Sequence, residues 1–84
     1  MKVKTFEGEY KLLEFNHYIQ DVNNNQISVL ELLIDTDVKE LDFIKKDLGN
    51  LFAIETNKQT YLFTNYEVSE YYLTDEGLKV VCIH

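Results

Sequence analysis

The side chains best suited to chemistry lie in the run VVCIH, residues 80–84. In an extended strand alternate residues share a face, so Cys82 and His84 are expected on the same side as Val80. A cysteine beside a histidine suggests either half of a zinc site or a nucleophile with its base. A structural zinc site needs four ligands, however, and the chain has one Cys and two His in all.

The spacing of Cys82 and His84 also argues against a nucleophile paired with a base. Residues i and i+2 of a strand lie about 6.6 Å apart, beyond the hydrogen-bond reach that a general base requires. We therefore predict that Cys82 packs in the core as a small hydrophobic residue and that His84 is a frayed terminal residue. For His17, in the other half of the chain, we predict a hydrogen-bonded histidine on a core-facing side rather than a ligand.

The acidic run DTDVKELD, residues 35–42, invites a calcium-binding interpretation that its spacing does not fit. An EF-hand loop needs an oxygen ligand at its fifth position and Gly at its sixth, where this chain has Lys39 and Glu40. No phosphate-binding glycine loop, G-x-S-x-G or H-E-x-x-H motif occurs. The sequence therefore predicts a protein that is not an enzyme and has no catalytic residue, metal or cofactor.

The net charge indicates which classes of binding partner are expected. Fifteen acidic residues against eight lysines give a charge of −7, and there is no arginine. Nucleic acid and anionic membranes attract cationic proteins, so neither is an expected partner, whereas a basic protein surface is. Solubility alone is the alternative reason for the charge. The single cysteine, the polar start MKVKTFEGEY and the absence of an apolar run of ~18 residues favour a cytoplasmic protein.

The first two alternating segments predict a β-hairpin with a defined register. EYKLLEFNHYI and ISVLELLID flank Asn23 and Asn24, and asparagine tolerates the positive φ of a tight turn. With a two-residue turn there, the expected cross-strand pairs are Leu13 with Ile34, Phe15 with Leu32, and His17 with Leu30.

The rest of the chain predicts one helix followed by an antiparallel meander. DVKELDFIKKDLG, residues 37–49, has an apolar stripe, an N-cap in Asp37 and a C′ glycine in Gly49. The later strands flank turns at Asn57-Lys58 and at 75–77, with Gly77 in the left-handed conformation, and a short extra strand from Val3 to Phe6 is expected before the hairpin. The expected fold is a single α+β domain over residues 1–84, an antiparallel sheet of about five strands with the helix packed on one face.

Two groups of side chains are candidates for binding a protein partner. A single helix covers one sheet face, so some tyrosines of TYLFTNYEVSEYYL should remain on a surface; these are Tyr61, Tyr66, Tyr71 and Tyr72. Tyrosines that merely tile a half-exposed sheet are the alternative. The second group is acidic and could attract a basic surface: Asp35, Asp37, Glu40 and Asp42.

The layout of these segments resembles that of small accessory or structural proteins encoded by phages and prophages of Gram-positive bacteria. The resemblance rests on the first hairpin, a short helix after Thr36-Asp37, the stretch ETNKQTYLFTNYEV and the closing strand LKVVCIH, and it covers most of the chain. It implies a non-enzymatic protein in the host cytoplasm or the virion. We expect it to bind a protein partner or itself through the Tyr-rich sheet face or through a strand edge, for which the closing LKVVCIH is the candidate. The alternative is an acidic inhibitor that occupies a basic nucleic-acid-binding groove of a host protein, of the anti-CRISPR or DNA-mimic type.

Overall fold

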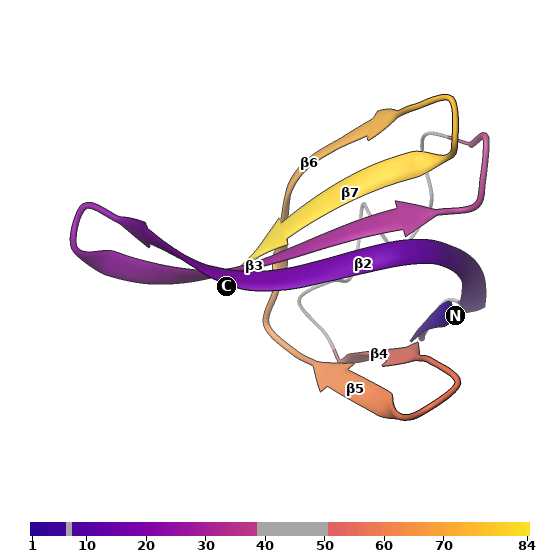
Figure 1. Ribbon diagram of the computed structural model, residues 1–84, viewed down its shortest axis with the longest axis horizontal. Coiled ribbons are helices and arrows are strands. Elements are labelled where there is room, and N and C mark those ends of the chain that lie inside the picture. The colour runs from indigo at the N-terminus through magenta and orange to yellow at the C-terminus, as the bar shows by residue number, and fades with distance from the viewer. Residues whose placement is uncertain (7, 39–50) are drawn as a thin grey trace.

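The computed structural model describes residues 1–6, 8–38 and 51–84, and the regular elements of this part are seven β-strands in one antiparallel sheet (Figure 1). The strand order across the sheet is β5-β4-β1-β2-β3-β7-β6. The strands are β1 (Lys2–Thr5), β2 (Gly8–Val22), β3 (Asn25–Ile34), β4 (Phe52–Glu55), β5 (Thr60–Phe63), β6 (Glu67–Leu73) and β7 (Leu78–Ile83).

The α+β class expected from the sequence is therefore wrong. All elements of the described part are strands, and they number seven rather than about five. The helix predicted over residues 37–49 lies outside the described residues, apart from Asp37 and Val38, which are not helical. The short strand expected near the N-terminus is β1, which pairs with both β2 and β4.

The sheet covers its own inner face because β2 is long and bends. The first part of β2, up to Lys11, pairs with β1, and the part from Leu12 to Val22 pairs with β3. A β-bulge at Leu13 marks the change of partner, and bulges bend a strand and increase its twist. The bulge also corrects one predicted pair: Leu12, not Leu13, lies opposite Ile34.

Contacts between distant strands show how far the sheet curls. β5 and β2 stand three places apart in the strand order, yet the ring of Tyr61 meets that of Phe15 at 5.6 Å between centroids, edge to face. The ring of Phe63 likewise lies 5.6 Å from that of His17. The curl brings the β4–β5 end of the sheet against the concave side of β2, so the sheet covers part of its own apolar face.

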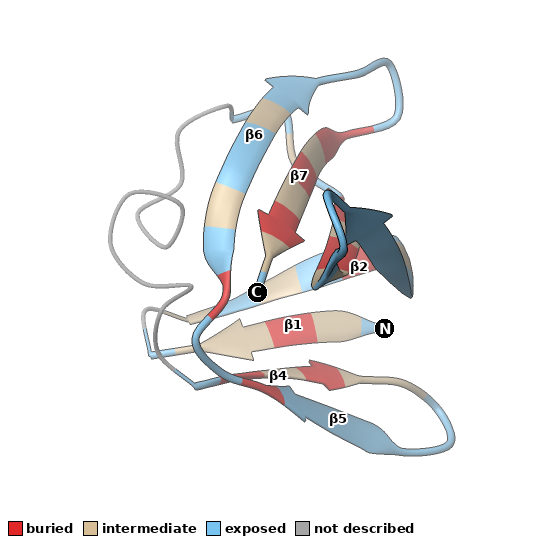
Figure 2. Cartoon of the chain, turned by 90° about the vertical axis from the view of Figure 1, so that its left-hand side faces the viewer, coloured by how far each residue is buried: buried red, intermediate tan, exposed pale blue. Residues whose placement is uncertain are grey.

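The core lies on the concave side of this curled sheet (Figure 2). The strands contribute alternate residues to it, as Val80 and Cys82 do from β7, while Val81 and Ile83 face outward and are half-buried. The buried cluster consists of Val3, Leu12, Leu30, Leu32, Ile34, Phe52, Ile54, Phe63, Tyr66, Leu78, Val80 and Cys82.

The three hairpins largely follow the predicted registers. Phe15 lies opposite Leu32 and His17 opposite Leu30, and the φ angles of Asn23 and Asn24 are 51° and 67°, as a tight primed turn requires. In the second hairpin, the pairs Phe52 with Phe63 and Ile54 with Tyr61 are also confirmed.

The third hairpin pairs Leu73 with Leu78, which leaves four residues, 74–77, in its turn rather than the predicted three. Gly77 does not have the positive φ expected of it. Glycine is needed there for space instead, because a Cβ at Gly77 would lie 2.3 Å from the backbone oxygen of Ile34.

Candidate functional site

The four tyrosines proposed from the sequence do not form one surface patch. Tyr66 is 7% exposed and belongs to the core, where its ring meets those of Phe52 and Phe63. Tyr71 is half-buried against the core, Tyr72 is exposed on the opposite face of β6, and Tyr61 is exposed at the rim beside Phe15. The structure thus separates these residues into core, rim and outer face.

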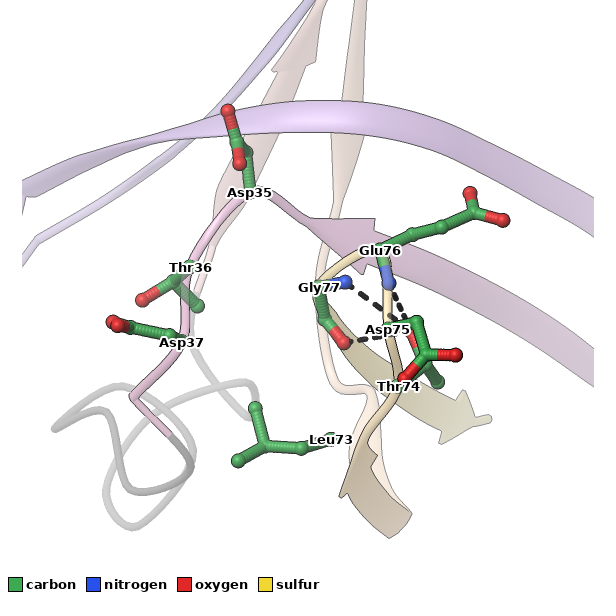
Figure 3. A pocket seen from close by; sticks show the side chains of 8 residues that line it. All are labelled: Asp35, Thr36, Asp37, Leu73, Thr74, Asp75, Glu76 and Gly77. Carbon is green, nitrogen blue, oxygen red and sulfur yellow. Dashed lines mark hydrogen bonds between the residues drawn. The ribbon is translucent and has the colours of Figure 1, made fainter.

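The proposed acidic group is partly brought together with acids from another strand connection. Asp35 and Asp37, after β3, line a pocket of about 440 Å³ together with Asp75 and Glu76 of the β6–β7 turn (Figure 3). Glu40 and Asp42 lie outside the described residues. Lys11 forms an ion pair with Asp35 at 3.5 Å between Nζ and Oδ2.

This acidic pocket is shaped by a turn with fixed geometry. Thr74 Oγ1 donates to the carbonyl oxygen of Gly77 at 2.9 Å and accepts from the backbone N–H groups of Glu76 and Gly77, each at 3.2 Å. These bonds hold the 74–77 turn beside the end of β3 (Figure 3). Within the described part of the chain, no group of three or more His, Cys, Asp or Glu side chains is arranged to hold a metal ion. The chemistry the pocket offers is attraction of a cationic side chain.

A polar cluster that sequence reasoning missed joins β2, β3 and the β5–β6 connection. Ser28 Oγ lies 2.8 Å from Nε2 of His17 and 2.6 Å from the hydroxyl of Tyr66, and that hydroxyl lies 3.3 Å from Nε2 of His17. His17 and Ser28 share a face of the predicted hairpin, so their proximity could have been read from the register. Nothing local in the sequence pointed to Tyr66, which only the curl of the sheet brings close.

A serine bonded to a histidine is the arrangement of a nucleophile and its base, so its surroundings matter. The backbone N–H of Ser28 donates to the carbonyl of His84, so it is not free to stabilise an oxyanion. Tyr66 supplies a second bond to the same hydroxyl, which fixes it between two neighbours. We therefore interpret the cluster as structural: it links the β2–β3 hairpin to the β5–β6 connection. A pocket of about 340 Å³ lies beside it.

In the run VVCIH, the prediction for Cys82 is confirmed and the prediction for His84 is wrong. Cys82 is 0% exposed, and its burial raises the pKa of the thiol to about 12, which keeps the less reactive protonated form. His84, expected to be frayed, is held by two backbone hydrogen bonds with Ser28, at 2.9 and 3.1 Å. Its ring lies 5.2 Å from that of Tyr66.

The most exposed regular element is the far end of the β2–β3 hairpin, which extends beyond the rest of the sheet (Figure 1). We call residues 16–27 the hairpin arm. It carries the exposed apolar side chains of Tyr18, Ile19 and Val22, and Ile19 is 58% exposed. Desolvation and the neighbouring Glu31 carboxylate raise the pKa of Tyr18, on the outer face.

One edge of the arm carries backbone groups that the described part of the chain does not pair. The N–H and C=O of Ser28 bond to His84, toward β7, so those of Ile19, its cross-strand partner, must point away from β3. By alternation, His17 and Asp21 present their backbone groups to the same side. Among the described strands, β1 stops beside Lys11 and Leu12, short of this edge.

Comparison with known proteins leaves the site to be interpreted from its own geometry. No family model, no curated protein and no solved structure matches the chain. In the part of the chain that the structure describes, no helix has both the length and the apolar character that crossing a membrane would require.

Proposed function

We propose that this chain is a non-enzymatic protein-interaction module that binds by pairing the open edge of β2, in the hairpin arm, with an extended strand of its partner. The observation that carries the proposal is the row of outward backbone groups at His17, Ile19 and Asp21, on an exposed arm. Strand addition of this kind draws its affinity from main-chain hydrogen bonds and its specificity from alternate side chains.

The arm differs from the other open edges of the described sheet in having no protection against pairing. Natural edge strands are kept from pairing by shortness, bulges or charged side chains. β5 has four residues, and β6 has a bulge at Ser69 and acids at Glu67 and Glu70. Along residues 15–30 the only formal charge is that of Asp21. An edge left long and nearly uncharged is suited to accepting a strand.

A lysine in the middle of the edge tests this proposal. Ile19→Lys adds a charge beside the outward backbone groups and should abolish partner capture from an extract of the organism that encodes the chain. Leu62→Lys, at another exposed apolar position, 68% exposed on β5, makes the same change in net charge and should leave capture intact. Backbone amides of His17 and Ile19 should become protected from hydrogen exchange in the captured complex. Equal capture by the two variants, without that protection, would refute strand addition.

A second candidate function is supported by the convergence of Asp35 and Asp37 with Asp75 and Glu76 at one pocket. It is an acidic inhibitor that fills a basic groove of a nucleic-acid-binding protein. The β6–β7 turn and the end of β3, which carry the pocket residues, lie at the opposite end of the molecule from the tip of the arm (Figure 1), so the two functions can be tested apart.

The double variant Asp37→Lys/Asp75→Lys should abolish inhibitor-type binding, mainly by slowing association, and that binding should weaken steeply with salt. Binding through the arm should survive the same variant. We place either function in the cytoplasm, since the only cysteine is buried and reduced, which fits a reducing compartment.

A further inference from the structure

We infer that the strand that pairs with the hairpin arm is β2 of a second copy of this chain, so that two arms join antiparallel about a two-fold axis at Ile19. This inference rests on the proposed function and names its partner. A two-fold contact presents the same surface from both copies, so one open edge supplies both halves of the interface. No further element of either chain is required.

The arrangement of backbone groups permits this pairing. In an antiparallel ladder, hydrogen-bonded pairs must join residues whose N–H and C=O both point to the shared edge. On β2 these are His17, Ile19 and Asp21. With the axis at Ile19, residue 19 meets its own counterpart, and each His17 meets the Asp21 of the other copy. Each of these pairs then exchanges two backbone hydrogen bonds.

Side-chain chemistry favours this register over those with the axis at His17 or at Tyr18. With the axis at His17, the two histidines would face each other, and with the axis at Tyr18, the Asp21 carboxylate would lie against the Phe15 ring. With the axis at Ile19, the only formal charge of the arm lies opposite its only histidine, a favourable cross-strand pair. The most exposed apolar side chain of the arm, Ile19, is then buried against its own copy at the centre.

Electrostatics makes the arm the place where two such chains can meet. Each copy carries a net charge of −7, so most approaches bring like charges together. Of the fifteen acids, only Asp21 lies within residues 15–30. The acidic pocket is lined by residues after β3 and in the β6–β7 turn. The end of β3 and the β6–β7 turn lie at the end of the molecule away from the proposed contact (Figure 1).

Sedimentation velocity across a range of concentrations tests the self-pairing. The wild-type chain should pass from monomer to dimer between about 10 μM and about 1 mM, the range expected of a small interface. Ile19→Lys should raise the dimer dissociation constant at least ~10-fold, because it places two ammonium groups at the axis. Leu62→Lys should dimerise like the wild type. Circular dichroism of both variants checks that neither result reflects unfolding.

A fluorescent label tests the register. Pyrene maleimide on Ile19→Cys should give excimer emission that grows with concentration, and on Tyr18→Cys weaker emission, because residue 18 is then diagonal to its counterpart at about 7–8 Å rather than directly opposite it. Cys82 is 0% exposed and remains unlabelled in the folded chain. Excimer emission that is stronger from residue 18 would overturn the register.

The outcomes separate this inference from the proposed function. A wild-type chain that stays monomeric at ~1 mM overturns self-pairing, and if Ile19→Lys still abolishes capture of another protein, strand addition at the arm stands. A dimer that Ile19→Lys does not weaken also overturns the inference, because it would form elsewhere. If Ile19→Lys still dimerises and still captures a partner, both the self-pairing and the proposed strand addition are refuted.

Discussion

The hydroxyl of Tyr66 makes polar contacts with two side chains from two different strands. It joins Ser28 and His17, while the ring beneath it packs on Phe52 and Phe63. One side chain therefore links the β5–β6 connection to both strands of the hairpin. These bonds give the hydroxyl of the buried Tyr66 partners at the partly buried Ser28 and the exposed His17.

We expect Tyr66→Phe to lower the free energy of unfolding by about 1 kcal/mol, since it removes a hydrogen bond but keeps the ring. Ser28 keeps His17 as a partner, which limits the loss. Urea denaturation measures the effect. Tyr72→Phe, at an exposed tyrosine of β6, is the matched control and should change stability little. Equal losses in the two variants would mean that the polar cluster contributes nothing.

The thiol of Cys82 gives a pH-dependent prediction with a definite sign. Burial raises its pKa from 9.0 to about 12 in the folded chain, so the unfolded chain loses the proton first as pH rises. The thiol therefore costs no stability below pH 9 and should destabilise the fold by roughly 1 kcal/mol at pH 10. Comparing wild type with Cys82→Ala at pH 8 and pH 10 isolates this term, and an unchanged difference would contradict it.

At the scale of elements, the hairpin arm depends on its turn. Asn23 and Asn24 both have positive φ, which costs a residue with a Cβ more than it costs glycine. The arm beyond the sheet has β2 and β3 as its only described strands, so little tertiary packing supports it. How often the arm opens should therefore depend on how well the residues at positions 23 and 24 tolerate a positive φ.

Asn24→Gly should stabilise the arm by about 0.5 kcal/mol, because Asn-Gly is the preferred pair for this turn, while Asn24→Ile should destabilise it by more. Hydrogen exchange of the Val22 and Asn25 amides, next to the turn, measures the local effect. Global unfolding should change less than local opening, since the arm can open while the sheet stays folded. Faster exchange in Asn24→Gly would show that the turn is of another type.

At the scale of the whole molecule, the two ends differ in charge and in shape. The nearly uncharged arm projects from one end, and the β6–β7 turn lies at the other, beside the end of β3 (Figure 1). These two segments carry the acids of the pocket, among them Asp35 and Asp75. Among the described residues, neither end offers the cationic surface that phosphate backbones require.

We therefore expect no shift of DNA or RNA in a gel at low salt, where electrostatic attraction between a protein and nucleic acid is strongest. The measurement needs only the purified chain, and a basic nucleic-acid-binding domain of similar size serves as the positive control. A shift that disappears as salt is added would contradict the expectation and point to a local cationic site.

The sequence by itself determined the local pairing. Strict alternation and the turn residues predicted that Phe15 meets Leu32 and Phe52 meets Phe63, because slipping a strand by one residue turns its apolar set outward. The same alternation predicted that Cys82 faces the core. These features follow from neighbours in the chain, within one hairpin or one strand.

Only the tertiary structure decided how the sheet buries its inner face. The bulge at Leu13 bends β2, and this bend brings Tyr61 to Phe15 and Phe63 to His17. The alternation of apolar and polar residues in the sequence does not predict where a bulge occurs. That bend also determines that Tyr66 is buried with Ser28, while the pairing of Ile34 with Leu78 places Asp35 and Asp75 at one pocket. The α+β expectation failed for this reason: an apolar sheet face needs a cover, and a sheet that curls supplies its own.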